Sequence, residues 1–285
     1  MRYSTTTVAI LFAVSLLLVT TTPVSADGVN ETRIADESTD LFVYFGDTDG
    51  RSFQNTRPSR SQFIDYAESE TGVSILNSFR ITNAVLVKVK PGFDVSNLSR
   101  VDGVRTVTHN TEVEVLGTPS SSISTNSIGT DGKYGLEQIG AQDTWSKYGT
   151  RGDGVNVAVL DTGVNVSHPD LTLRTTDPSD PTYPGGWAEF DAEGDRIGSE
   201  PSDPQGHGTH VSGIVAGEHT GVAPDVNLMH GSILQSDGSG TLAQALAGIE
   251  WAVENDADVV TMSLGGEPNR AWVDAVRNAN SMGVV

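Results

Sequence analysis

The sequence predicts an α/β protein in which a parallel β-sheet covered by helices follows a smaller α+β domain. Two observations support this fold class. Beyond residue 155, apolar strand-like runs alternate with helical segments, and such alternation indicates a parallel sheet with helices on its faces. Between residues 41 and 108 the predicted order is β-α-β-β-α-β, which is that of the ferredoxin-like or split βαβ sandwich.

The amino terminus has the pattern of a secretory signal peptide. Met1-Arg2-Tyr3 precedes an apolar run from Val8 to Val19, and small residues lead up to Ala26. The alternative is a membrane anchor, but this run falls well short of the roughly 20 apolar residues that span a bilayer. We predict a signal peptide over residues 1–26 and a secreted, extracellular protein that has no membrane contact once the signal is removed.

Residues 27–116 are predicted to form the small α+β domain. Short runs of β-branched and aromatic residues indicate strands, and the segments between them have helical spacing. In chain order we expect a strand at 41–45, a helix at 61–70, strands at 73–79 and 84–89, a helix at 95–101 and a strand at 104–108.

A polar segment over residues 117–130 is predicted to be an exposed linker, because it cannot bury much surface. The region 131–285 then holds the α/β elements. We expect strands at 155–160, 226–233 and 258–262 and helices at 209–216, 242–254 and 271–282. Val284-Val285 looks like the start of another strand, so we expect this chain to be an amino-terminal fragment whose sheet is incomplete.

Composition excludes several functions. The chain contains no cysteine, which removes disulfides and a cysteine nucleophile. Its formal charge of −20 disfavours nucleic acid as a partner, since phosphates would repel it. An acidic protein of this kind is either simply soluble or suited to high salt, and we favour a halophilic protein.

Two short segments carry residues suited to proton transfer. Asp161 follows a predicted buried strand, at the sheet edge where α/β proteins gather their sites. Alone, such an aspartate is more often a loop or capping residue. His207, which enters a small-residue helix between Gly206 and Gly208, changes that interpretation. An imidazole can take a proton from a serine hydroxyl, and a fixed carboxylate orients the imidazole and offsets its charge.

The segments Val157-Ala-Val-Leu-Asp161-Thr-Gly-Val and Gly206-His207-Gly-Thr-His-Val-Ser-Gly resemble the aspartate and histidine boxes of the subtilisin-like serine proteases. The acidic composition and secretory signal are similar to those of halolysin-type proteases of halophiles. The resemblance covers roughly Tyr134 to the end of the chain. It implies an Asp-His-Ser triad in which Asp161 orients His207 and His207 is the general base, and a serine endopeptidase acting on proteins and peptides.

The resemblance also implies a substrate-binding site and an inhibitor. Two glycine-containing segments look like the family's paired substrate-binding edges, which bind a peptide backbone by strand addition. Their residues are Gly238, Ser239 and Gly240, and Ser263, Leu264 and Gly265. The small domain over 27–116 resembles the family's inhibitory propeptide, so the chain's own propeptide is an expected intramolecular partner. We expect a monomer.

The family's serine box and its oxyanion asparagine are not found in the sequence, so this chain alone is predicted to be inactive. Ser281 superficially resembles the nucleophile's neighbourhood, but it lies where a helix should end before Gly283. A non-catalytic propeptide or pseudoprotease that binds peptides is the alternative. A metal-dependent hydrolase using His207 and His210 would need ligands that the local sequence does not offer.

No cofactor is required by this interpretation, and calcium is the one candidate. Asp170 stands at a position that ligates calcium in relatives, but the loop that completes their site is replaced here by Gly217-Glu-His-Thr220. An insertion over residues 172–205 carries further oxygen ligands of the kind calcium uses. They are Asp177, Asp180, Asp191, Glu193, Asp195, Glu200 and Asp203. No metal-binding residue is therefore assigned.

Dilution into low salt is predicted to unfold or inactivate the protein. Carboxylate repulsion is screened when the Debye length shrinks to about 3 Å at 1 M salt, and it grows as salt is removed. Circular dichroism across a salt series would measure the change, and a fold and activity that persist at low salt would contradict the prediction.

Overall fold

The structure is a computed structural model that describes residues 35, 37–46, 58–116, 133–175 and 186–285. The predicted signal peptide (residues 1–26) and the predicted linker (residues 117–130) lie outside the described residues. In the part of the chain that is described, no helix is long and apolar enough to cross a membrane.

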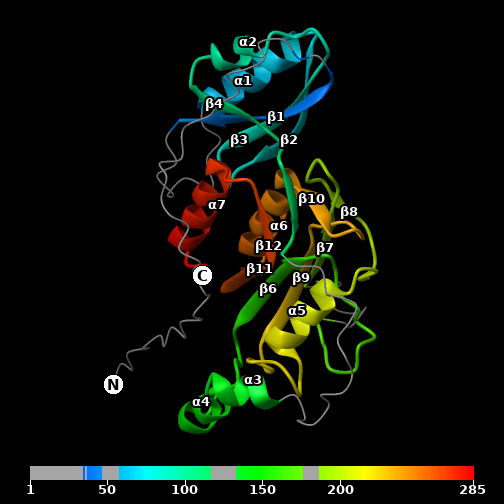
Figure 1. Cartoon of the computed structure of the whole chain (residues 1–285). Helices are drawn as coiled ribbons and strands as arrows, with labels where there is room; N and C mark the ends of the chain where they lie inside the picture. Colours follow the sequence, from blue (N-terminus) through cyan, green and yellow to red (C-terminus); the bar gives the residue numbers. More distant parts are fainter. Residues whose placement is uncertain (1–34, 36, 47–57, 117–132, 176–185) are drawn as a thin grey trace, which may run out of the picture.

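The amino-terminal unit is a four-stranded antiparallel sheet, in the order β2-β3-β1-β4, with helices on one face (Figure 1). The element order along the chain is the one predicted, with α2 shorter than expected. The elements are β1 (Thr39–Phe45), α1 (Pro58–Ser69), β2 (Val73–Phe79), β3 (Ala84–Val89), α2 (Ser96–Ser99) and β4 (Val104–His109).

The side chains of strand β1 are buried on both faces of this sheet. Successive side chains of a strand point to opposite faces, and residues 41–45 of β1 are all buried. Leu41, Val43 and Phe45 belong to the core beneath α1 and α2. Phe42 and Tyr44 instead join the core of the second unit, which includes α6 (Leu242–Glu254) and α7 (Arg270–Ser281).

The second unit contains a five-stranded sheet in the order β11-β6-β9-β7-β8. Strands β11 (Val259–Met262), β6 (Asn156–Asp161), β9 (Asn227–Ser232) and β7 (Trp187–Phe190) pair in parallel. Strand β8 (Arg196–Ile197) pairs antiparallel with β7, so the predicted parallel sheet has one antiparallel edge. The sequence analysis missed β7 and β8 because they are short and lie within the acidic insertion.

The helices of this unit agree with the predicted positions, and α6 matches to the residue. Helix α5 (His207–Ala216) begins two residues before its predicted start at 209, and α7 lies within one residue of its prediction. Two further helices, α3 (Lys133–Gln138) and α4 (Ala141–Tyr148), were not predicted.

The carboxyl-terminal residue lies along the edge of β11, although residues 284 and 285 form no strand. The Val285 amide donates to the Asp258 carbonyl at 2.9 Å, and the Val260 amide donates to the Val285 carbonyl at 2.8 Å. This staggered exchange is the pattern of a parallel ladder.

The two units meet where the amino-terminal sheet packs on α6 and α7 (Figure 1). The Asn278 side-chain amide donates to the Ile81 carbonyl at 2.6 Å, and Arg80 Nε lies 3.1 Å from Glu250 Oε1. These polar contacts lie beside the apolar contacts of the shared core, so the units form a continuous interface.

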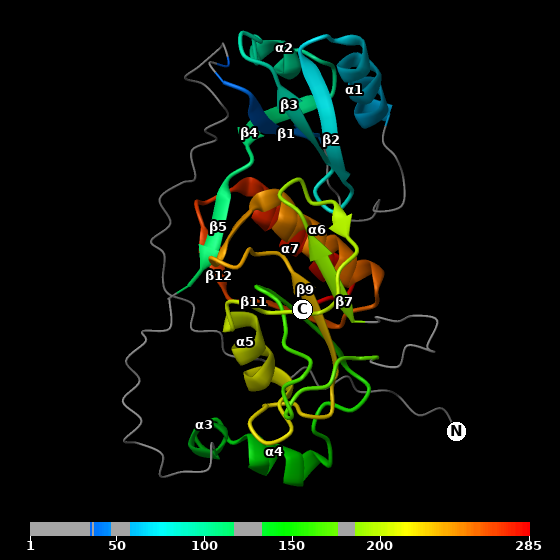
Figure 2. The same ribbon diagram turned by 90° about the vertical axis from the view of Figure 1, so that its right-hand side faces the viewer.

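A third sheet joins the units through one strand. Strand β5 (Glu112–Val115) lies between β10 (Ser239–Thr241) and β12 (Leu264–Gly266), antiparallel to both. Figure 2 shows β5 leaving the amino-terminal unit after β4 and running beside β12. The predictions did not include β5, whose strand partners in the described part of the chain are more than a hundred residues away in sequence.

Candidate active site

Asp161 is the last residue of β6, at the carboxyl end of the parallel sheet. Its side chain is fully buried, and β6 lies between β11 and β9. The residues before Asp161 in β6, Val157 to Leu160, are all apolar and buried, as expected for a central strand that is covered on both faces of the sheet. A buried carboxylate requires hydrogen-bond donors nearby. Here Oδ1 has two partners, from the next residue and from the following helix, whereas Oδ2 is buried without a hydrogen-bond partner among the described residues.

His207 is the first residue of α5 and is only 8% exposed. Gly206 before it has φ +87°, a left-handed conformation that glycine adopts without strain, and this turn directs the chain into the helix. The His207 amide donates to Gln205 Oε1 at 2.8 Å. The helix therefore starts at the predicted histidine itself.

The two predicted residues form a hydrogen bond: His207 Nδ1 lies 2.7 Å from Asp161 Oδ1. The same oxygen accepts the Thr162 amide at 2.8 Å. A carboxylate acceptor at this distance places the proton of a neutral imidazole on Nδ1 and leaves the lone pair of Nε2 free to take a proton. In the part of the chain that is described, no hydrogen bond involves Nε2 of His207.

Burial dominates the electrostatics of this pair. It raises the pKa of the Asp161 carboxyl, against the opposing effect of hydrogen bonds from His207 and Thr162. Desolvation destabilises the charged carboxylate, and a protonated imidazole would restore part of that lost stabilisation. The pair can therefore stabilise an imidazolium more strongly than an exposed aspartate would.

All six predicted substrate-binding residues lie along β5. Ser239 and Gly240 pair with Glu114 and Val113 on one side, and the Val115 amide donates to the Gly238 carbonyl at 3.0 Å. On the other side, Leu264 and Gly265 pair with Val115 and Glu114, and the Leu116 amide donates to the Ser263 carbonyl at 3.3 Å. The two edges therefore hold one extended segment between them.

Glycines allow this close approach. A Cβ on Gly238 would lie 2.9 Å from Val115 Cγ2, and one on Gly265 would lie 2.6 Å from Leu116 Cδ2. A side chain at position 265 would require the Leu116 side chain to move, and one at position 238 would also be strained, because Gly238 has φ +85°. Val113 is fully buried in the shared core, whereas Glu112 and Glu114 are exposed.

The other residues considered from sequence lie apart from this pair. His210 is exposed on α5, and Ser281 ends α7 with its hydroxyl donating to the Asn278 carbonyl at 2.7 Å. That Ser281 has no catalytic role stays a prediction.

Asp170 is a poor candidate for a calcium ligand. Its Oδ1 accepts the His219 amide at 3.0 Å and lies 2.6 Å from His219 Nδ1, and its Oδ2 accepts the Thr220 hydroxyl at 3.1 Å. The short turn thus uses both carboxylate oxygens. Among the described residues, no group of three or more histidines and carboxylates could hold a metal. Asp177 and Asp180 lie outside the described residues.

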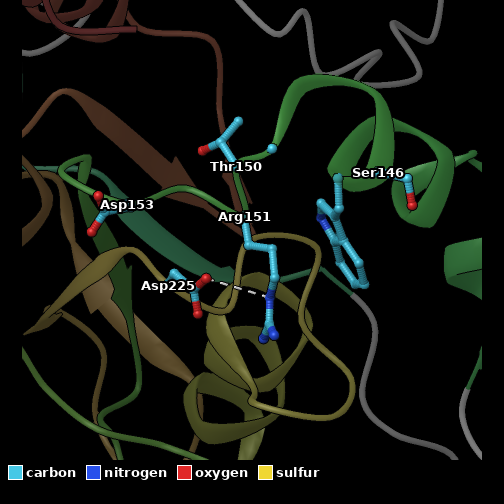
Figure 3. Close-up of a pocket in the computed structure, with 7 residues that line it drawn as sticks. Ser146, Thr150, Arg151, Asp153 and Asp225 are labelled. Atoms are coloured by element: carbon cyan, nitrogen blue, oxygen red, sulfur yellow. Dashed lines mark ion pairs between the residues drawn. The ribbon is translucent and has the colours of Figure 1, made fainter.

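A pocket near α4 is separate from the site. Figure 3 shows Arg151 beside Asp225, and both residues line the pocket together with Trp145. Arg151 Nε lies 3.5 Å from Asp225 Oδ2, and its guanidinium carbon lies 5.4 Å from the centre of the Trp145 ring. No predicted site residue lines this pocket.

Sequence reasoning missed Thr162 and Gln205 and considered Asp203 only as one of the acidic residues of the insertion; all three form hydrogen bonds around the pair. The available signal was an aspartate shortly before a helix start, which is typical of a helix cap. It also missed His230 of β9, which is fully buried with its Nδ1 3.0 Å from the Ser212 hydroxyl. The His230 ring lies beneath the helix start, since a Cβ on Gly208 would be 3.0 Å from its Cε1.

Comparison with known proteins found a matching family model and similar proteins. Residues 152–285 match the model of the Subtilase family. The chain is 38% identical over 160 residues to a thermostable alkaline protease of Halalkalibacterium halodurans, covering 53% of this chain and 39% of that protein. It is 31% identical over 226 residues to an alkaline protease of Alkalihalobacillus alcalophilus, covering 76% of this chain and 51% of that protein.

Among solved structures, the crystal structure of fervidolysin from Fervidobacterium pennivorans is similar, with a TM-score of 0.59 and 22% identity. The similarity covers 87% of this chain and 39% of that one, and at this identity it shows the fold alone. The chain spans about half the length, or less, of these relatives.

Acidification is predicted to destabilise the fold through His230. Burial lowers its pKa from 6.5 to about 3, although Asp203 acts in the opposite direction. Between these two pH values His230 binds a proton in the unfolded chain but not in the folded chain. The free energy of unfolding therefore decreases as the pH falls from 6.5 toward 3. Asparagine does not titrate, so over this pH range the free energy of unfolding of His230→Asn should decrease less steeply than that of the original protein, by up to about 1.4 kcal/mol per pH unit.

Urea unfolding at several pH values measures this slope. His210→Asn is the matched control, because His210 is exposed and should leave the slope unchanged. Equal slopes in the original protein and His230→Asn would contradict the prediction.

Proposed function

Because residues 152–285 belong to the subtilase family, we propose that the protein is a secreted serine endopeptidase that hydrolyses peptide bonds through an Asp-His-Ser triad. Asp161 and His207 are two members of that triad. The proposal is supported chiefly by one observation, the 2.7 Å hydrogen bond between Asp161 Oδ1 and His207 Nδ1 at the carboxyl end of the parallel sheet.

The proposed chemistry follows from this pair. His207 Nε2 takes the proton of a serine hydroxyl as the oxygen attacks the substrate carbonyl, and Asp161 stabilises the imidazolium that forms. His207 then gives the proton to the leaving amine. The serine and the asparagine of the oxyanion hole are not among the described residues, and we propose that a longer gene product supplies them and that residues 1–285 alone do not cut peptides.

Substrate binding by strand addition is supported by the position of β5. The backbone of residues 113–116 is bonded to β10 on one side and β12 on the other. Such pairing uses main-chain groups and places few demands on sequence, which suits an enzyme acting on extended proteins and peptides. Gly238, Ser239, Gly240, Ser263, Leu264 and Gly265 are the proposed substrate-binding residues.

The amino-terminal unit is the proposed inhibitory propeptide, with a ferredoxin-like topology over residues 27–116. Its support is the antiparallel sheet order β2-β3-β1-β4, its packing on α6 and α7, and the position of β5 between the two edges. In this proposal, cutting within residues 117–130 separates it from the catalytic region that begins near residue 131. Secretion and adaptation to high salt remain part of the proposal, supported by the amino-terminal pattern and the charge of −20. A monomeric state is proposed as well.

Loss of His207 is predicted to abolish proteolysis by the complete gene product, including any residues that follow Val285. Without the general base, His207→Ala should lower kcat by roughly 10⁴-fold or more. Hydrolysis of an unfolded protein substrate measures this, and a serine-directed phosphonate should block the original enzyme.

His210→Ala is the matched control, since His210 is exposed on the same helix. It should keep full activity. Inhibition by chelators but not by the phosphonate would instead indicate the metal-dependent hydrolase. Peptide binding without hydrolysis would indicate the non-catalytic binding module.

Val113→Asp is predicted to release β5 from the groove of residues 1–285. Val113 is fully buried, and an unpaired carboxylate there would be strongly destabilising. Hydrogen exchange of the Val115 and Leu116 amides, which bond to Gly238 and Ser263, should accelerate by roughly 100-fold.

Glu114→Gln is the control, because this side chain on the same strand is exposed. Its exchange rates should match those of the original chain, and amides of β6 should stay protected in both variants. Unchanged protection of Val115 in Val113→Asp would count against burial of Val113 as the interaction that retains β5.

A further inference from the structure

Asp203 joins the strand end that carries Asp161 to the helix that carries His207. Its Oδ1 accepts the Thr162 hydroxyl at 2.9 Å and the Gly206 amide at 2.8 Å. Its Oδ2 accepts both the amide and the hydroxyl of Thr209, at 2.8 and 2.6 Å. A single half-buried carboxylate is therefore bonded to the neighbours of both members of the pair.

Thr162 carries the connection to Asp161. Its backbone amide donates to Asp161 Oδ1, the same oxygen that meets His207 Nδ1. Its hydroxyl donates to Asp203 and accepts the Gly208 amide at 3.0 Å. A fixed position of this hydroxyl therefore holds Thr162, which follows Asp161, close to Gly208, which follows His207.

The helix start depends on the same carboxylate. The first amides of a helix have no partner within the helix, and a glycine before α5 offers no side chain to cap them. Gln205 accepts the His207 amide, Thr162 the Gly208 amide and Asp203 the Thr209 amide. A negative charge at this end is also stabilised by the helix dipole.

Thr209 extends the connection to the loop after β6. Its hydroxyl donates to Asp203 and accepts the Asn165 amide at 2.9 Å. Close backbone packing accompanies it, since the Val164 amide donates to the Ser202 carbonyl at 3.1 Å. A Cβ on Gly163 would overlap that same carbonyl oxygen.

The charge state of Asp203 suits this role. Although partial burial acts to raise its pKa, hydrogen bonds from Thr209, Gly206 and Thr162 hold the pKa of its carboxyl below the usual value. It therefore stays ionised and accepts all four hydrogen bonds at neutral pH. Asp203 also acts electrostatically on the buried His230 ring, whose pKa it acts to raise against the larger effect of burial.

We propose that Asp203 is a positioning residue that holds the imidazole of His207 against Asp161 by joining Thr162 to the first turn of α5. It does not touch the reacting atoms and acts through Thr162, Gly206 and Thr209. Its significance for catalysis rests on the proposed function, whereas its effect on the pair does not.

The test is proton NMR of residues 1–285, following the His207 Nδ1 proton that is bonded to Asp161. The signal is assigned by its loss in His207→Gln. In Asp203→Asn, this proton should shift and exchange with water about tenfold faster or more, because hydrogen bonds to an ionised acceptor are lost. Asp170→Asn is the matched control, since Asp170 accepts three hydrogen bonds near the other end of α5. It should leave the signal unchanged.

A second pair of variants keeps the test decisive if Asp203→Asn does not fold. Thr209→Ser retains the hydroxyl and should preserve the signal, whereas Thr209→Val removes it and should speed exchange. An unchanged signal in Asp203→Asn, an equal change in Asp170→Asn, or equal signals in the two Thr209 variants would overturn the proposal.

Kinetics of the complete gene product give an independent readout. Asp203→Asn should lower kcat by roughly tenfold while KM stays nearly constant, because β10 and β12 are untouched. A complete gene product without any proteolysis would contradict the proposed function, and the NMR comparison would still decide the role of Asp203.

Discussion

Burial of the Asp161 carboxylate is the constraint on which the site depends. A charged group with no exposed surface is stable only where donors are fixed near it, and here they are the amide of the next residue, Thr162, and Nδ1 of His207, 46 residues after Asp161 in the chain. The strand end, the first turn of α5 and the segment before that helix must therefore meet at hydrogen-bond distances. The glycines at 163, 206 and 208 allow that meeting, because their backbones approach or turn where a side chain would collide or be strained.

The second organising feature is the spacing between β10 and β12. Neighbouring strands lie about 4.8 Å apart, so two edges separated by one strand are roughly 10 Å apart. Since an α-helix with its side chains is about 10–12 Å wide and cannot pair with these edges, the groove accepts a single extended chain. In this structure that chain is residues 112–116, and a folded helix of another protein would first have to unwind to enter.

The sequence predicted those parts of the structure that local patterns determine. Strands β2 and β3 and helix α6 match to the residue, because their periodicity and boundaries lie within each segment. Asp161, His207 and the two glycine-containing segments were identified from short motifs. In the structure Asp161 and His207 are hydrogen-bonded to each other, and the two segments lie on either side of β5. Strand β5 was missed because Glu-Val-Glu-Val has no partner nearby in sequence. Asp203 was noticed only as one of many acidic residues, since its hydrogen bonds form between segments that only folding brings together.

The position of β5 has a consequence for solubility. Within the described residues, β10 and β12 have no other strand partner, so departure of β5 would leave two edges with unpaired backbone groups. Open edges pair readily with any extended chain, including a second copy of the same protein, and are a common origin of aggregation. Their shortness, at three residues each, limits this hazard. The strand that fills the groove thus also protects the molecule from self-association for as long as it remains there.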